Sequence, residues 1–428
     1  MIDPRVFRDA EAYAAARQRL LRRDAGLAPL LDALRDLAER RRKAIGEGDE
    51  LKARLNAGSR KVGELKKAGG DAAALMAQMA TLSDQAKAAS KDAEGIDAEF
   101  HAQLLHIPNL PADDIADGGE EAHEIVRSIG TPAVLQPWHQ PHWDTAAALG
   151  LIDLERGAKI AGSGFPLFTG LGARLERALI QWLLDAASSE HGYTEVAPPL
   201  LVTRESMTGT GQLPKFEEDL YRTSDDLFLV PTAEVPVTNM HRGEILAFEQ
   251  LPLRYCAYTP CFRREAGSAG KDTRGILRVH QFDKVELVWL TAPEASEAAL
   301  ATLTGHAEIA HQRLGLAYRV LRLAAGDFSF AAHRTYDIEV WAPGVARWLE
   351  VSSCSTFTDY QARRLDIRFR REKGAKPEFV HTLNGSQLGL ARVLIAVIEN
   401  GQQADGSVVV PEVLRPWMGV DRIGPGRA

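Results

Sequence analysis

The chain has few cysteines and no long apolar run. Three cysteines occur among 428 residues, Cys256, Cys261 and Cys354, and none belongs to a C-x-x-C pair. Such a small and odd number of cysteines argues against a disulfide framework and favours a reducing compartment. The missing C-x-x-C spacing argues against a structural zinc site. We find no stretch of 18 apolar residues and no apolar N-terminal leader, so we expect no membrane span, no signal peptide and a cytoplasmic location.

The sequence also lacks the glycine motifs by which many α/β proteins bind nucleotides. Gly209-x-Gly211 has no third glycine three residues later, and Gly270-Lys271 lacks the upstream glycine of a P-loop. If the chain uses ATP, it does so without a mononucleotide-binding βαβ unit. The net charge of −7 gives no overall nucleic-acid signal, so any basic surface must be local.

Two periodic stretches indicate a long antiparallel helical hairpin near the N-terminus. Apolar residues recur at three- and four-residue steps over residues 27–65 and again over 75–100, which is the 3.5-residue period of coiled-coil seams. A turn signal, Lys-Ala-Gly-Gly-Asp, occupies residues 67–71 between them. We expect two helices of roughly 35 to 40 residues, on the order of 50–60 Å long.

Charge separates along this hairpin. Residues 40–67 carry ten cations and four acids, a net of +6, whereas residues 71–105 carry two cations and six acids, a net of −4. Two interpretations of this charge separation are open. Either the charges pair between the two helices, or the basic residues form a strip that lies along nucleic-acid phosphates. Pro108 and Pro111 end the second helix. The acidic, glycine-rich residues 113–121 then indicate a linker, with a domain boundary near 111.

The stretch Thr259–Glu286 carries the elements of a nucleotide site. Two apolar runs flank a basic segment rich in glycine, which predicts two long strands joined by a flexible loop, the first strand ending in Arg263-Arg264-Glu265. Arg263 can fork onto phosphate oxygens. Glu265 can accept from an amine, and Phe282 offers a flat face to a base. Together they indicate an ATP site on an antiparallel sheet, with an ordinary surface hairpin as the alternative.

Polar side chains also stand at the ends of other predicted strands. Thr232 and Glu234 stand on either side of Ala233 at a predicted strand end, so both side chains can face the same pocket. There they would suit the ammonium and the hydroxyl of a small amino acid such as serine. A surface salt bridge explains Glu234 equally well. Glu350 and Ser353 are hard oxygen donors that suit Mg²⁺ carrying a phosphate chain.

An apolar helix is predicted from Leu388 to Asn400, directly after a strand. It bears Arg392 near its start. A cation at a helix N-terminus can clamp an anion together with the free backbone N–H groups.

These segments resemble the motifs of class II aminoacyl-tRNA synthetases, in the seryl form. Phe262-Arg-Arg-Glu-Ala-Gly-Ser followed by Arg278-Val-His-Gln-Phe resembles motif 2, the amphipathic segment 174–184 with Pro199 resembles motif 1, and Arg392 stands where the ATP-binding arginine of motif 3 falls. The likeness to bacterial-type seryl-tRNA synthetases covers nearly the whole chain.

The resemblance implies the fold, the domains and the partners. It implies an α+β protein in which an antiparallel-sheet class II catalytic domain at 112–428, with a linker at 112–130, follows a coiled-coil hairpin at 1–111. In this family the hairpin grips the long variable arm of tRNA(Ser), and motif 1 forms a homodimer interface. Charging of selenocysteine tRNA is left open.

The resemblance also assigns site residues and an ATP-dependent ligase reaction. ATP would contact Arg263, Arg264, Glu265, Val279, Phe282, Glu350, Val351, Ser352, Ser353 and Arg392, and L-serine would contact Thr232, Ala233, Glu234, Glu286 and Ser386. Arg263 and Arg392 would be catalytic, with Mg²⁺ held by Glu350, Ser353 and ATP, and without zinc. The serine carboxylate would attack the α-phosphorus to give seryl-adenylate, and the seryl group would pass to tRNA(Ser).

Three positions depart from the commoner seryl pattern, namely Thr356, Gln387 and Ala391. They leave the charged and hydroxyl groups in place, so we expect modest kinetic effects and retained activity. A seryl-activating paralogue that loads a carrier or serves a biosynthetic pathway is one alternative, but such relatives usually lack the hairpin. An inactive tRNA-binding scaffold is another, but it would be expected to have lost charged motif residues that this chain keeps.

Overall fold

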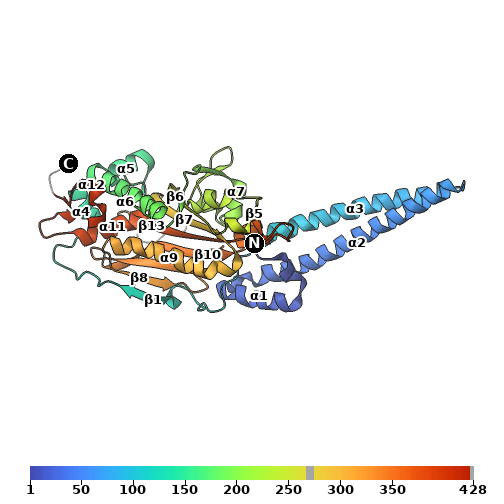
Figure 1. Ribbon diagram of the computed structural model, residues 1–428, viewed down its shortest axis with the longest axis horizontal. Coiled ribbons are helices and arrows are strands. Elements are labelled where there is room, and N and C mark those ends of the chain that lie inside the picture. The colour runs from blue at the N-terminus through green and yellow to red at the C-terminus, as the bar shows by residue number, and fades with distance from the viewer. Residues whose placement is uncertain (267–273, 425–428) are drawn as a thin grey trace. The chain divides into compact units, whose positions relative to one another are not determined.

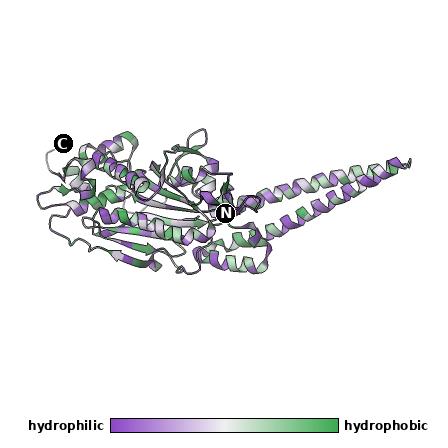
Figure 2. Ribbon diagram, in the orientation of Figure 1, coloured by the Kyte–Doolittle hydropathy of each residue, from purple (hydrophilic) through white to green (hydrophobic). Residues whose placement is uncertain are grey.

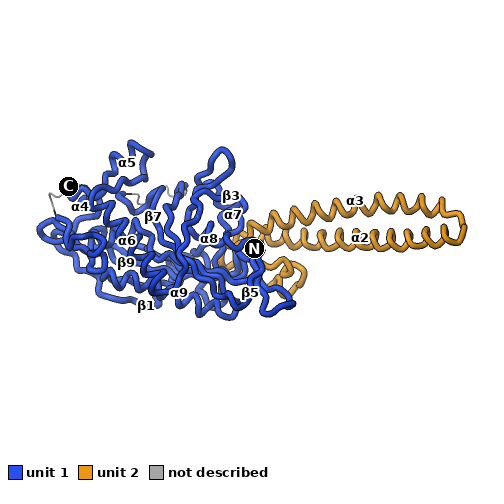
Figure 3. The backbone as a smooth tube through the Cα atoms, turned by 45° about the horizontal axis from the view of Figure 1, so that its top comes forward, with its two compact units in different colours: residues 1, 109–428 blue, residues 2–108 orange. Residues whose placement is uncertain are grey.

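The computed structural model describes residues 1–266 and 274–424 in two compact units, residues 2–108 and residues 1 and 109–428 (Figures 1 and 3). The centre of the loop predicted between the two strands, including Gly270 and Lys271, lies outside the described residues. Within the described ranges, no helix combines the length and the apolar character needed to cross a bilayer.

The first unit is a helical hairpin preceded by a shorter helix. α2 has 40 residues and α3 has 32, so the predicted hairpin is confirmed, although α3 is shorter than expected and the short α1 was not predicted. The two long helices pack against each other and are joined by the predicted turn. The unit comprises η1 Pro4–Arg8, α1 Ala10–Arg23, η2 Ala25–Leu27, α2 Ala28–Lys67 and α3 Ala73–Leu104.

The seam of the hairpin is broad at its base and thin towards the turn. Phe7 and Phe100 meet edge to face at 5.7 Å, and the Arg41 guanidinium lies 5.4 Å over the Phe100 ring while pairing with Asp97 of α3. Along α2, all of whose residues are described, Gly58 is the one buried position after Gly48. Hydrophilic and hydrophobic residues alternate along both helices (Figure 2). The outer part of the hairpin therefore has little core of its own.

The second unit is built on an eight-stranded sheet with the order β1-β8-β9-β10-β13-β7-β6-β2. All neighbours pair antiparallel except β2 and β6, so the predicted antiparallel sheet is confirmed. β1 lies within the segment predicted as a linker. The strands of this sheet are β1 Glu124–Ile129, β2 Thr194–Glu195, β6 Leu253–Phe262, β7 Gln281–Thr291, β8 Tyr318–Arg322, β9 Arg334–Ala342, β10 Arg347–Thr358 and β13 His381–Gly389.

Three helices supply most of the apolar cover of the sheet. α6 (Gly170–Ser189), α9 (Ser296–Arg313) and α11 (Leu390–Gly401) share one core with alternate residues of the strands. On β7, Val285, Leu287 and Trp289 belong to that core, whereas the residues between them face the opposite side, as the two-residue period of a strand requires. One face of the sheet is therefore free of these helices for part of its length.

Smaller elements surround the sheet. They are η3 Glu120–Ala122, α4 His142–Ala148, α5 Leu154–Ala161, β3 Leu201–Thr203, α7 Arg204–Thr210, η4 Glu217–Asp219, β4 Leu227–Leu229, α8 Glu234–Asn239, β5 Ile245–Ala247, η5 Phe248–Gln250, η6 Pro293–Ala295, α10 Tyr360–Leu365, β11 Arg368–Arg370, β12 Glu378–Phe379, β14 Val408–Val409, η7 Glu412–Leu414, α12 Arg415–Met418 and β15 Arg422–Ile423. β3 pairs with β4, β14 pairs with β15, and β12-β11-β5 form a third small sheet.

Two sequence predictions of strand placement are wrong. β6 ends at Phe262 and β7 begins at Gln281, so Arg263–Glu265 and Val279 lie just outside the strands. Beyond the end of β6, Glu265 takes a left-handed φ of 52°, which is uncommon for a residue other than glycine. Glu234 opens α8 and does not end a strand. The Thr232 hydroxyl accepts from the Glu234 N–H at 3.3 Å, a local bond that favours a helix start.

Candidate active site

A cavity of about 670 Å³ lies in the second unit, lined by β7, β10, β13, the start of α11 and several loops. Thirteen of the fifteen predicted site residues line it. They are Thr232, Glu234, Arg263, Glu265, Val279, Phe282, Glu286, Glu350, Val351, Ser352, Ser353, Ser386 and Arg392. Its size falls in the range of small-molecule sites.

Strand alternation explains why β7 contributes so strongly. Phe282, Lys284 and Glu286 are two residues apart, and all three face the cavity. Glu286 is in register with Ser386 on β13, and the Ser386 hydroxyl donates to Glu286 Oε2 at 3.2 Å. The open face of the sheet is thus the floor of the site.

Two guanidinium groups from distant parts of the chain line the same cavity. Arg263, just after β6, lies 5.1 Å over the Phe282 ring, and its Nε donates to Pro231 O at 3.4 Å. Arg392, in the first turn of α11, donates from Nη1 to the backbone oxygen of Glu350 at 2.9 Å and from Nε to Leu277 O at 3.3 Å. Two cations that converge on one cavity can bind and polarise a polyphosphate.

One wall combines a ring with a charged pair. The Glu265 carboxylate pairs with Arg278 at 2.5 Å, and both side chains line the cavity together with Phe282 and Val279. A ring face, an aliphatic side chain and a carboxylate that can accept from an exocyclic amine suit an adenine base.

The polar end of the cavity contains a buried ion pair. Lys284 Nζ lies 2.5 Å from Glu286 Oε2 and 2.7 Å from Thr232 Oγ1, and the Lys284 and Glu286 side chains are 7% and 1% exposed. Glu286 Oε1 is buried and has no hydrogen-bond partner among the described residues. Because an unpaired buried carboxylate oxygen is costly, this atom suits a ligand that brings a donor such as an ammonium or a hydroxyl.

Glu234 is the second buried carboxylate at this end. Its two oxygens accept from Gln361 Nε2 at 2.6 Å and from Asn384 Nδ2 at 2.8 Å. Burial, followed by the charge of Glu286, raises the pKa of Glu234 to about 7. An ammonium placed beside these two carboxylates would stabilise the ionised form of Glu234.

Glu350 and Ser353 lie on β10 and line the cavity, and Glu350 lies beside the guanidinium of Arg392. Glu350 Oε2 is 3.3 Å from Arg392 Nη1. Asp337, which is opposite Ser353 on β9, has a pKa raised by burial and by the charge of Glu350, and its Oδ1 has no partner among the described residues. The oxygen atoms of Glu350 and Ser353 fit Mg²⁺, which usually takes one or two protein carboxylates and keeps phosphate and water as its other ligands.

The remaining two predicted residues lie outside the cavity lining. The Ala233 side chain belongs to a small apolar core behind the site, and the Arg264 guanidinium lies 5.5 Å over the ring of Tyr221. Of the three unusual positions, Ala391 lines the cavity. Thr356 is buried and shares a 2.9 Å hydrogen bond with Ser296. Gln387 is buried, with its Oε1 unpartnered among the described residues.

Sequence reasoning missed several lining residues. The sequence could have indicated Lys284 and Asn384, because each stands two residues from a predicted site residue on the same strand and therefore faces the same side of the sheet. Ser329 and Phe330 lie in the loop between β8 and β9, and no spacing in the sequence places them at the cavity. In the described part of the chain, no group of three or more His, Cys, Asp or Glu side chains is arranged to hold a metal ion.

The comparisons define first the class and then the family. Residues 215–401 match the model of the class II tRNA synthetase core domain for glycine, histidine, proline, serine and threonine. A prolyl-tRNA synthetase from Giardia lamblia, 17% identical with a TM-score of 0.55 over 67% of this chain and 58% of its own, shares this fold. The antiparallel sheet and the cavity on its open face are therefore those of a class II synthetase core.

The N-terminal unit narrows the assignment. Residues 1–111 match the model of the seryl-tRNA synthetase N-terminal domain. A serine–tRNA ligase of Gemmatimonas aurantiaca is 51% identical over 98% of this chain and 99% of its own length, and one of Trichlorobacter lovleyi is 51% identical over 98% of each. A seryl-tRNA synthetase from Pyrococcus horikoshii, solved with ATP, superposes with a TM-score of 0.93 at 34% identity over 99% of this chain and 100% of that chain. The chain belongs to the seryl-tRNA synthetase family.

Proposed function

We propose that the chain is an ATP-dependent ligase that joins L-serine to tRNA(Ser) through a seryl-adenylate. The observation that carries the proposal is the convergence of Arg263 and Arg392 on a cavity that Thr232, Glu234 and Glu286 also line. The guanidinium groups suit a polyphosphate, and the carboxylates suit an ammonium. The curated relatives that match this chain over nearly their whole length are named serine–tRNA ligases.

The first step needs no protein nucleophile. The serine carboxylate attacks the α-phosphorus in line, the bond from the α-phosphorus to the bridging oxygen breaks, and pyrophosphate leaves. Arg263 and Arg392 would hold the phosphates and stabilise the charge that develops on them. Phe282 would stack on adenine, and Glu265 would accept from its amine. The adenylate would then pass its seryl group to the terminal ribose of tRNA(Ser).

The serine pocket would bind through groups that already point into it. The buried, unpartnered Glu286 Oε1 would accept from the substrate, with Thr232, Glu234 and Ser386 around it. A site built to bond a hydroxyl disfavours alanine by roughly 10⁴ to 10⁵, because its polar groups would otherwise stay unpaired. We propose selenocysteine tRNA as a second acceptor, because it would be charged with the same seryl group.

Glu350 and Ser353 would hold Mg²⁺ together with ATP. When bound, the ion neutralises phosphate charge and polarises the leaving pyrophosphate.

The three cysteines are unpaired and buried, which fits a reducing compartment, and we propose the cytoplasm as the location of the protein.

The proposed partners act at two other surfaces. The N-terminal hairpin, residues 1–111 in our domain division, would bind the tRNA through the basic residues of α2. A second copy would pack at motif 1, where Pro199 is exposed beside Leu200 and Leu201, which are 41% and 45% exposed. Light scattering tests the dimer, and a molar mass of one chain would contradict it.

Serine-dependent ATP–pyrophosphate exchange tests the proposed function. Arg392→Ala should lower kcat by about 100-fold or more, because one charge-stabilising group is worth roughly that much. Arg371→Met, at an exposed arginine that is not part of the cavity, is the matched control and should keep the wild-type rate. Exchange without serine dependence in the wild-type protein would reject the proposed substrate, and normal exchange by Arg392→Ala would reject the role of that arginine.

A further inference from the structure

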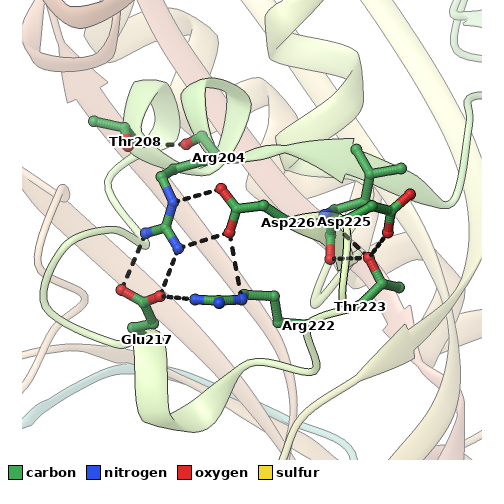
Figure 4. Close-up of polar contacts among 8 residues, drawn as sticks. Arg204, Thr208, Glu217, Arg222, Thr223, Asp225 and Asp226 are labelled. Carbon is green, nitrogen blue, oxygen red and sulfur yellow. Dashed lines mark hydrogen bonds and ion pairs between the residues drawn. The ribbon is translucent and has the colours of Figure 1, made fainter.

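Four charged residues form a closed cluster beside the cavity (Figure 4). Arg204, the first residue of α7, makes two forked ion pairs, with Glu217 at 2.6 and 3.1 Å and with Asp226 at 2.9 and 2.9 Å. Arg222 closes the ring by contacting Glu217 at 3.0 Å and Asp226 at 3.3 Å. The Arg204 guanidinium also lies 5.1 Å over the Phe228 ring. Such a planar, two-sided fork is a geometry that lysine cannot reproduce.

The cluster ties the middle and the C-terminal end of one segment of the cavity wall to the start of α7. Residues 211–226 connect α7 to β4, and within them Gln212, Phe216, Asp219 and Leu220 line the cavity. Glu217 begins η4, directly between Phe216 and Asp219. Arg204 therefore holds the segment at the point from which its lining side chains project.

The same segment holds the end of β6. The Asp219 backbone oxygen accepts from the Arg264 N–H at 2.9 Å, and Asp219 Oδ1 accepts from the Ala266 N–H at 3.0 Å. Between these two donors stands Glu265, whose carboxylate lines the cavity, and just before them stands Arg263. A chain of contacts thus runs from Arg204 through η4 to the residues that we propose for ATP.

The cluster contributes little to global stability. The Arg204, Glu217 and Asp226 side chains are 40%, 39% and 47% exposed, and ion pairs with this exposure are individually weak. Hydrogen bonds from Arg204 lower the pKa of both carboxyls, so the stability from their pairing is fully present above their ordinary pKa and is lost as the pH falls through the lowered pKa. A weak but geometrically strict network can set the position of a loop without determining whether the protein folds.

We propose that Arg204 is a positioning residue for ATP, which acts by holding Glu217 and Asp226 so that Asp219 keeps the end of β6, with Arg263 and Glu265, in the geometry for binding. The proposal rests on the proposed function of the cavity. Its effect should fall on ATP and leave serine recognition, at Glu286 and Ser386, unchanged.

A second cluster elsewhere in the chain supplies a matched control. Arg371 makes forked pairs with Glu294 at 2.7 and 3.0 Å and with Glu378 at 2.7 and 3.1 Å, and it is 42% exposed. Neither Arg371 nor its partners line the cavity. Arg371→Met therefore removes the same kind of network without touching η4 or the end of β6.

The experiment compares Arg204→Met, Arg204→Lys and Arg371→Met in the full chain. We expect Arg204→Met to raise the KM for ATP in pyrophosphate exchange by about tenfold with the KM for serine unchanged, since a small misplacement of binding groups has effects of this order. Arg204→Lys should recover only part of the loss, because it keeps the charge but not the fork. Hydrogen–deuterium exchange at the amides of residues 264 and 266 should be faster in Arg204→Met than in Arg204→Lys, and unchanged in Arg371→Met.

The outcomes separate this proposal from the proposed function. If the wild-type protein shows no serine-dependent exchange, the function itself fails. If the wild-type protein is active but Arg204→Met matches Arg371→Met in the KM for ATP and in amide exchange, the positioning role is overturned. Equal loss for ATP and serine, or a similar fall of Tm in Arg204→Met and Arg204→Lys with unchanged exchange at residues 264 and 266, would likewise overturn it, because those results indicate a merely structural cluster.

Discussion

At the residue scale, the polar end of the cavity depends on charges that are hidden from water. Lys284 and Glu286 are almost fully buried and contact each other at 2.5 Å. Desolvation makes such a pair a modest source of stability, but it makes each partner indispensable to the other. Lys284 therefore pairs with Glu286 and holds its carboxylate in place, although sequence patterns drew attention only to Glu286.

Removing one charge of the Lys284–Glu286 pair should destabilise the protein more than removing both charges. Lys284→Met should lower the free energy of unfolding by roughly 3–5 kcal/mol, because it leaves Glu286 uncompensated in the interior. The double variant Lys284→Met/Glu286→Gln should be more stable than the single variant. Urea unfolding of both proteins measures the difference, and a double variant that is no more stable than Lys284→Met would show that the two charges are not coupled.

Glu234 should make stability depend on pH. Burial and Glu286 raise its pKa in the folded protein to about 7, above the ordinary value of 4.5, so the folded state keeps a proton that the unfolded chain releases. Its contribution is fully present below about pH 4.5 and is lost as the pH rises to about 7, by on the order of 3 kcal/mol at most.

Glu234→Gln tests this sign. Between pH 5 and 8, the free energy of unfolding of the variant should rise relative to that of the wild-type protein, because the variant has no carboxyl to ionise at that position. Urea titrations across this range provide the measurement. Parallel pH curves for the two proteins would show that Glu234 titrates normally.

At the element scale, the outer half of the hairpin is held together by helix propensity more than by packing. Beyond Ala44, the only buried residues of α2, all of which is described, are two glycines, Gly48 and Gly58. Gly63 is exposed, and a Cβ added there would have nothing within 4 Å, whereas a Cβ at Gly58 would lie 2.0 Å from Met79 Sδ. The two glycines have the same helix propensity but different surroundings.

Gly63→Ala should therefore stabilise the hairpin and Gly58→Ala should do so less or not at all. Replacing an exposed helical glycine by alanine gains about 0.8–1 kcal/mol, and at Gly58 the displacement of Met79 offsets this gain. Far-UV circular dichroism during urea unfolding measures both variants. Equal stabilisation would mean that Met79 moves aside at no cost.

At the scale of the whole molecule, the two units would divide the reaction between them. The cavity that binds ATP and serine lies within residues 109–428, and the basic residues of α2 lie within residues 2–108. Amino-acid activation should then be independent of the hairpin, and transfer to tRNA should depend on it.

Reversing charge on α2 should separate the two steps. Arg60→Glu/Lys61→Glu should weaken tRNA(Ser) binding, raise the KM for tRNA and reduce the salt dependence of charging, because each lost phosphate contact reduces the salt slope by about one. Pyrophosphate exchange should stay at the wild-type rate. Asp92→Lys/Glu94→Lys on α3 is the matched control, and an equal effect of that pair on charging would contradict a role for the basic strip.

The sequence predicted the elements better than their ends. The 3.5-residue period located α2 and α3, because long apolar seams are local and periodic. The strand before the motif 2 loop was predicted too long, since Asp219, distant in sequence, accepts from the Arg264 and Ala266 amides in place of a strand neighbour. No local pattern carries that information.

The sequence alone determined the family, the antiparallel sheet and thirteen of the residues that line the cavity, because motif residues and alternating strands are encoded within short windows of the chain. The tertiary structure alone decided which groups meet. It placed Lys284 against Glu286 and turned Ala233 and Arg264 away from the cavity. It also joined Arg204 to the end of β6 through η4. Those contacts depend on packing between segments far apart in the sequence, which no periodicity records.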